Sequence, residues 1–154
     1  MEALDVYGIC NPLIDLLSHV PEPFLGEHGL EKDRMYLVEL EQQQSLLTAL
    51  AAQNLPIEFA SGGSGANTMI GIAQLGGRAA FTGKVGQDGH GDSYRDGLES
   101  QGVKSCLGTG PGLTGSSLIL VAPDAARTMN THLGMCQQLG AADIDLEALR
   151  ASRY

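Results

Sequence analysis

The glycine-rich stretch at residues 62–67, Gly-Gly-Ser-Gly-Ala-Asn, constrains the fold more than any other part of this chain. It follows a short apolar run at residues 57–60 and opens a helical pattern over residues 66–75. Glycine accepts backbone angles that other residues resist, and the N–H groups that begin a helix suit polar or anionic ligands. The stretch therefore predicts a strand-to-helix turn that either approaches a ligand or needs small residues for packing.

Two nucleotide-binding patterns do not match the glycine-rich stretches. The dinucleotide pattern GxGxxG requires a glycine at position 68, which is Thr68. A P-loop around Lys84 requires a glycine at position 78, which is Arg78, and a Ser or Thr after the lysine, where Val85 stands. A second glycine-dense loop at residues 83–91 follows the next expected strand, and ligands of open α/β sheets lie at the carboxyl ends of strands.

Composition excludes several classes of protein. A net charge of −9, with only nine scattered Lys and Arg residues, argues against nucleic acid as a partner. No apolar run is long enough to span a bilayer, and the N-terminal residues lack the layout of a signal peptide, so we expect a cytoplasmic protein without membrane contact. The three cysteines and four histidines are dispersed, which predicts neither a disulfide framework nor a metal site.

Helical and strand-like segments alternate through the first two-thirds of the chain, which predicts an α/β fold with a parallel sheet. The segment 35–38 and a hairpin around residues 122–125 do not fit that alternation, so we expect them in a separate small β-sheet. The expected strands are 5–10, 13–20, 35–38, 79–85, 116–121 and 127–133, and the expected helices are 39–54, 66–75, 91–101 and 145–150.

Four ordered motifs together resemble the ribokinase-like (PfkB) family of carbohydrate and nucleoside kinases. Residues 62–67 and 83–91 resemble its first signature, and residues 121–131 its lid hairpin. Residues 8–15, Gly-Ile-Cys-Asn-Pro-Leu-Ile-Asp, are similar to its opening strand and lean towards the adenosine-kinase-like branch. The resemblance implies a ribokinase-like parallel sheet flanked by helices, incomplete, with a small β-sheet lid. Residues 1–154 would be the N-terminal half of the kinase domain, with lid segments near 12–40 and 105–135.

The resemblance also implies a substrate-binding site for a sugar or nucleoside. Asp15 would accept hydrogen bonds from paired sugar hydroxyls, because an ionised carboxylate makes strong charge-assisted bonds. The alternative is a carboxylate that caps the turn after the preceding proline. Asn11, Gly62, the backbone around Gly63 and the side-chain amide of Asn67 would hold the same sugar.

The resemblance assigns the charged residues of the hairpin and of the second glycine loop either to substrate contact or to structure. Arg127 would contact the transferred phosphate, as similar lid arginines do, or form a solvated salt bridge in the hairpin. Lys84 and Asp88 are expected to bind neighbouring backbone rather than substrate. The strands of the small sheet would close over the sugar and exclude water.

Two family motifs are missing from this chain, and family members are roughly twice as long. The Asn-x-x-Glu segment for magnesium is absent, and so is the Gly-Ala-Gly-Asp anion hole; residues 140–143 are Gly-Ala-Ala-Asp, which we interpret as a loop. ATP and Mg²⁺ would serve the full-length family and are not expected to bind this chain tightly. No residue of the chain is therefore expected to be catalytic or to bind a metal.

The sequence thus predicts the N-terminal part of an ATP-dependent sugar or nucleoside kinase, inactive alone. The alternative is a non-catalytic sugar-binding or lid-mediated dimerisation module, with a homodimer formed through the lid or an exposed sheet edge.

Overall fold

The chain divides into two compact units. A computed structural model describes residues 3–154. The first unit contains the residues up to Ile14 together with Ser61–Gly115 and Gly134–Tyr154. The second unit contains Asp15–Ala60 and Ser116–Leu133.

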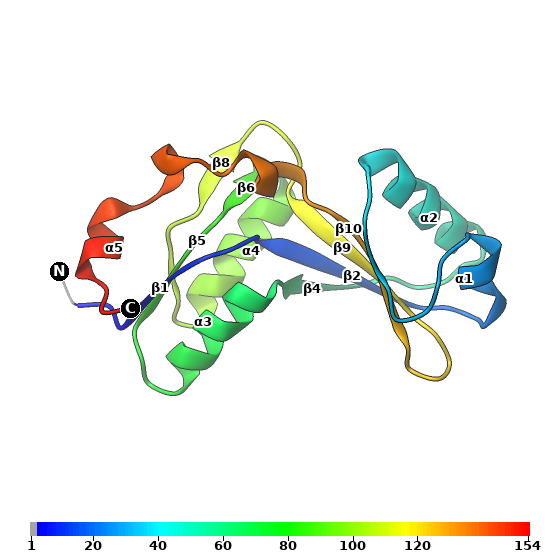
Figure 1. The fold of residues 1–154 in the computed structure, drawn as a ribbon, viewed down its shortest axis with the longest axis horizontal. Helices are drawn as coiled ribbons and strands as arrows, with labels where there is room; N and C mark the ends of the chain where they lie inside the picture. The colour runs from blue at the N-terminus through cyan, green and yellow to red at the C-terminus, as the bar shows by residue number, and fades with distance from the viewer. Residues whose placement is uncertain (1–2) are drawn as a thin grey trace. The chain divides into compact units, whose positions relative to one another are not determined.

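A parallel sheet forms the centre of the first unit (Figure 1). Its order is β1 (Val6–Ile9), β5 (Ala79–Thr82) and β7 (Lys104–Ser105), and both pairings are parallel. A separate parallel pair joins β6 (Lys84–Gly86) to β8 (Gly108–Gly110). The expected single strand 79–85 is therefore two strands that belong to different sheets.

Gly83 separates these two strands because it packs tightly against the segment that follows β1. A Cβ atom at this position would lie 2.4 Å from Cδ of Pro12 and 2.5 Å from the carbonyl oxygen of Cys10. No larger residue fits there without movement of the backbone. This contact joins positions far apart in the sequence, so the local β-forming pattern does not reveal it.

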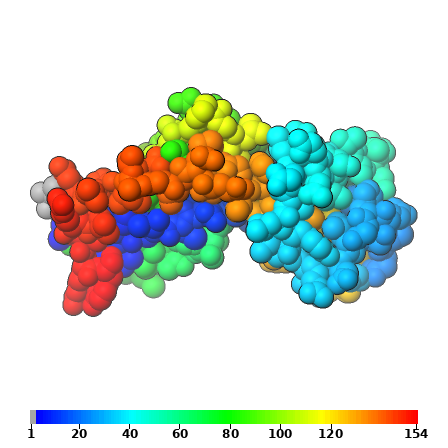
Figure 2. Space-filling view, turned by 45° about the horizontal axis from the view of Figure 1, so that its top comes forward, coloured from blue at the N-terminus to red at the C-terminus, as the bar shows by residue number. Residues whose placement is uncertain are grey.

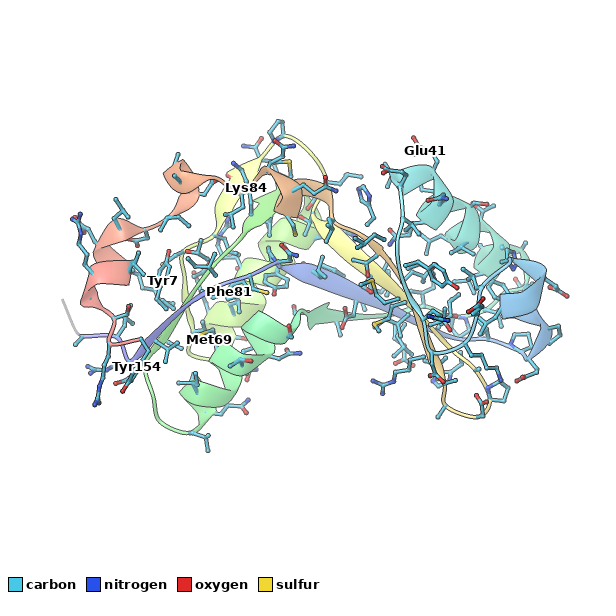
Figure 3. All side chains as sticks on the ribbon, viewed as in Figure 1. Tyr7, Glu41, Met69, Phe81, Lys84 and Tyr154 are labelled. Carbon is cyan, nitrogen blue, oxygen red and sulfur yellow. The ribbon has the colours of Figure 1, made fainter. Side chains whose placement is uncertain are left out.

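Helices cover both faces of the parallel sheet. α3 (Ser64–Gln74) packs on β1 and β5, and a Cβ on Gly8 would lie 2.9 Å from the sulfur of Met69, which Figure 3 labels on this helix. α4 (Gly89–Ser100) contacts β7 and β6.

Side chains alternate along a strand, so the same strands also present residues to the opposite face of the sheet. That face packs against α5 (Leu146–Ala151). Tyr7 and Ala80 form a buried cluster with Ala148 of this helix. The residues after α5 run beside β1, where the N–H of Tyr7 donates to the carbonyl of Tyr154 at 2.8 Å. In Figure 2 this C-terminal segment, in red, lies on the surface of the first unit.

Two 3₁₀ helices, η1 (Gly134–Gln138) and η2 (Ala141–Asp143), precede α5. The segment 140–143, expected as a loop, thus contains a short 3₁₀ turn. It is anchored by the carboxylate of Asp143, which pairs with the ammonium of Lys84 at 2.9 Å.

The second unit has a five-stranded sheet with the order β3-β10-β9-β2-β4. β10 pairs antiparallel with β9 and parallel with β3. The expected hairpin is confirmed, whereas the expected small sheet is larger than its three predicted strands, because β2 and β4 join it. The strands are β2 (Leu13–His19), β3 (Met35–Leu37), β4 (Glu58–Gly62), β9 (Gly115–Val121) and β10 (Arg127–His132).

α1 (Pro23–Glu27) and α2 (Leu40–Ala52) complete the second unit. α2 packs on β10, and its buried residues Leu46 and Leu50 face the sheet. Its first turn is closed by a capping box, in which Gln42 accepts a hydrogen bond from the N–H of Glu39.

The expected α/β class is confirmed, with a parallel sheet flanked by helices. Within residues 3–154, no helix is both long enough and apolar enough to cross a membrane.

Candidate functional site

The turn that begins α3 has a backbone conformation that requires glycine. Gly63 is the N-cap residue of α3 and has a φ of +96°. A Cβ at this position would lie 2.8 Å from the carbonyl oxygen of Asn11. Both the backbone angle and the close approach therefore exclude a side chain. The structure thus brings Asn11 and Gly63 together at the carboxyl end of β1.

Two neighbours stabilise this turn. The buried hydroxyl of Tyr94, on α4, donates to the carbonyl of Gly62 at 2.8 Å. A Cβ on Gly65 would lie 2.4 Å from Cβ of Cys10, so α3 starts in direct contact with the segment after β1. For Gly65 the packing interpretation of the glycine-rich stretch is therefore correct. No pattern in the sequence points to Tyr94, which lies 32 positions from its partner.

Asn11 and Asn67 present side-chain amides in the first unit. Asn11 is exposed and follows the carboxyl end of β1. Asn67 is exposed in the first turn of α3, where its N–H donates to the carbonyl of Gly63 at 3.0 Å. Asn67 and Gly62 also line a cavity of about 280 Å³ beside α4. Amide side chains both donate and accept hydrogen bonds, so these groups suit hydroxyl-bearing ligands.

Asp15 lies in the second unit, on β2. It is half-buried and points to the opposite face of the strand from its buried neighbours Leu16 and Ser18. Desolvation raises the pKa of its carboxyl above the usual range. A partly desolvated carboxylate gains free energy when a ligand donates hydrogen bonds to it.

Arg127 is the first residue of β10, also in the second unit, and it is exposed. Its backbone N–H donates to the carboxylate of Asp33 at 3.3 Å. Within the described chain no ion pair involves the Arg127 guanidinium; the ion pair at the hairpin turn joins Lys32 to Asp124 at 2.9 Å. Of the six residues that the sequence assigns to substrate binding, the first unit holds Asn11, Gly62, Gly63 and Asn67, and the second holds Asp15 and Arg127.

Asp88 has a structural role, as predicted. It is the N-cap residue of α4 and accepts a hydrogen bond from the N–H of Gly91 at 2.8 Å. It also accepts from Thr114, from the backbone N–H at 2.8 Å and from the hydroxyl at 2.6 Å. Desolvation acts to raise its pKa, but the hydrogen bonds from Thr114 and Gly91 outweigh it and hold the pKa below the usual range.

Lys84 is also held by the protein, although by a side chain rather than by backbone. Its ammonium pairs with Asp143, and this pairing lowers the pKa of the Asp143 carboxyl. Among the residues that the structure describes, no group of three His, Cys, Asp or Glu side chains is placed to hold a metal ion.

Comparison with known proteins places this fold among kinases. The family model described as "pfkB family carbohydrate kinase" matches residues 35–151. A probable sugar kinase from Rhizobium etli CFN 42 has 34% identity and a TM-score of 0.87, over 99% of this chain. An adenosine kinase from Sinorhizobium meliloti has 35% identity and a TM-score of 0.83, over 99% of this chain. An adenosine kinase from Anopheles gambiae, at 24% identity and a TM-score of 0.83 over 96% of this chain, shares the fold.

This chain spans 46% of the length of each of the two bacterial kinases, and 45% of the Anopheles enzyme. The family match covers most of the described residues and includes both glycine-rich stretches and the hairpin. The chain belongs to the pfkB family of carbohydrate kinases.

Proposed function

We propose that this chain carries the substrate-binding part of an ATP-dependent kinase that phosphorylates a hydroxyl of a sugar or nucleoside. Its similarity to a sugar kinase and to an adenosine kinase supports this substrate class. The observation that carries the proposal is the Gly63 turn, which packs against Asn11 at the carboxyl end of β1. Ligands of α/β sheets bind at this end of the strands.

Each proposed binding residue has a chemical role. Asp15 accepts hydrogen bonds from neighbouring hydroxyls of the substrate, which offsets the desolvation of its carboxylate. Asn11 and Asn67 donate and accept with further hydroxyls, and the backbone at Gly62 and Gly63 lets the substrate approach closely.

Arg127 has the charge required to contact a phosphoryl group. Its guanidinium is exposed and enters no ion pair with the described residues, so its charge is not neutralised locally. The second glycine loop has a supporting role, since Asp88 ties α4 to Thr114.

We further propose that the 154-residue chain alone does not transfer phosphate. Family membership implies ATP and Mg²⁺ for full-length kinases, and phosphoryl transfer depends on positioned metal and hydrogen-bond donors. The nearest match to the family's anion-hole motif, residues 140–143, ends in Asp143. Because this carboxylate pairs with Lys84, it is not placed as a base for a substrate hydroxyl.

A titration of the purified chain tests the binding proposal. Adenosine and ribose are titrated by calorimetry into the parent, Asp15→Asn and Asp96→Asn; Asp96 is an exposed carboxylate of α4 and serves as the matched control. We expect one or both compounds to bind the parent and Asp96→Asn alike, and to bind Asp15→Asn at least about tenfold more weakly. If Asp15→Asn binds as tightly as the parent, Asp15 is not part of the site.

One observation favours a second candidate, a module that dimerises through the five-stranded sheet. β3 is an edge strand of this sheet, and its side chains Met35 and Leu37 are 57% and 65% exposed. Exposed apolar edge strands recruit partners. Light scattering of the parent and of Leu37→Lys tests it: a dimer that the lysine dissociates supports this role, and a monomeric parent excludes it.

A further inference from the structure

A second cavity lies in the second unit, beside α2, β3 and β10, and has a volume of about 520 Å³. Its rim includes Glu41 and Gln42, which are exposed in the first turn of α2; Figure 3 labels Glu41 there. Asn130 and Leu46 also line it and are buried, at 0% and 7% exposure, so they form its floor. A cavity of this size is typical of sites for small organic ligands.

Asn130 is the unusual residue of this cavity. Neither the Oδ1 nor the Nδ2 atom of its side chain has a hydrogen-bond partner among the described residues. Buried polar atoms are almost always paired, because leaving them unpaired destabilises the fold.

The direction of the Asn130 side chain follows from its strand. Side chains alternate along β10, so Asn130 shares a face with Thr128. The Thr128 hydroxyl donates to the carbonyl of Glu31, in the segment that leads from α1 to β3. From α2, the amide of Gln43 reaches the backbone carbonyl of Asn130 at 2.9 Å. The unpaired amide therefore lies on the helix-covered face of the sheet, where the cavity is.

The remaining lining defines the chemistry of a ligand. An asparagine amide offers one donor and one acceptor side by side, which match the edge of a planar heterocycle that carries both. The rings of Tyr36 and His28 provide aromatic surface. Nδ1 of His28 lies 2.8 Å from the carbonyl of Phe24, and a donor there leaves Nε2 as an acceptor. No Lys or Arg lines this cavity, and Glu41 disfavours anions.

We propose that Asn130 is the recognition residue of a binding site for an uncharged planar nitrogen heterocycle of the nucleobase type. This site is independent of the proposed substrate site at Asp15, and it requires no catalytic activity. Occupancy would pair the Asn130 amide and so stabilise the second unit.

Titration of the ¹⁵N-labelled 154-residue chain with adenine tests the proposal by NMR. We carry it out in the Asp15→Ala background, so that binding at the proposed substrate site is weakened and contributes less. We expect a saturable shift of the Asn130 side-chain NH₂ resonance, and weaker binding of AMP, because the negative charge of Glu41 on the rim disfavours a phosphate. An unchanged Asn130 resonance at millimolar adenine, or AMP binding as tightly as adenine, would overturn the proposal.

Three variants in the same background complete the test. Asn130→Leu removes the unpaired amide, so we expect a higher urea midpoint and at least about tenfold weaker adenine binding. Asn130→Asp keeps the shape of the side chain but replaces the donor with an acceptor, so it should also bind adenine more weakly than the parent. The control is Ser18→Ala. It removes a different buried unpaired group of the same unit, a hydroxyl outside the cavity lining, and should leave binding unchanged. Adenine binding at parental affinity by either folded Asn130 variant would contradict the inference.

Discussion

Replacement of Gly63 by alanine tests whether the turn before α3 is built as described. The new Cβ would meet the carbonyl oxygen of Asn11 at 2.8 Å, and the residue would have to keep a φ of +96°. Backbone strain of this kind costs about 1–3 kcal/mol, and overpacking against immobile backbone adds about 1–3 kcal/mol. We expect Gly63→Ala to lower the free energy of unfolding by about 2–6 kcal/mol, a large fraction of a typical domain's stability.

Gly71 is the matched control because it lies inside the same helix and nothing is within 4 Å of its would-be Cβ. Alanine there should stabilise the helix by about 0.5–1 kcal/mol. Urea unfolding of both variants, followed by circular dichroism, measures the difference directly. If Gly63→Ala is as stable as Gly71→Ala, the positive φ of Gly63 and its close contact with Asn11 are contradicted.

Three further predictions follow from named contacts. Asp88→Asn should lower stability at pH 7. The pKa of Asp88 in the folded chain lies below the unfolded value of about 3.9. The ionised carboxylate therefore contributes to folding stability above that value, and this contribution is lost as the pH falls through the folded pKa. The parent's urea midpoint should drop more steeply below pH 4 than that of Asp88→Asn. Tyr94→Phe should lower stability by about 1–2 kcal/mol in thermal unfolding, since it leaves the carbonyl of Gly62 without this hydrogen bond; an unchanged melting temperature would contradict it. Burial raises the pKa of the Cys136 thiol to about 11, so mass spectrometry should find this thiol unalkylated in the folded chain at pH 8 and modified in urea; rapid labelling of the folded chain would refute its burial.

Much of the fold is visible in the sequence because it is encoded locally. The apolar spacing of α2 and the turn residues of the β9–β10 hairpin predict those elements directly, and both are observed. α1 escapes prediction because it has only five residues, and β7 because it has only two. Elements this short carry no measurable periodicity.

The candidate site is less accessible to sequence reasoning. The turn at Gly63 could be placed from its glycines, but its contact with Asn11 joins segments some fifty positions apart. Two of the three hydrogen bonds of Asp88 depend in the same way on Thr114, 26 positions away. Only the resemblance to a family motif points to Asp15, since one carboxylate in a strand has no signature of its own. Tertiary packing, rather than local pattern, determines which polar groups meet.

The central proposal is that a hydroxyl-bearing substrate binds at the turn before α3. The most direct measurement is an NMR titration of the labelled 154-residue chain with adenosine and with ribose. We predict saturable shifts of the backbone amides of residues 62–67. Shifts confined to other residues would contradict the proposal.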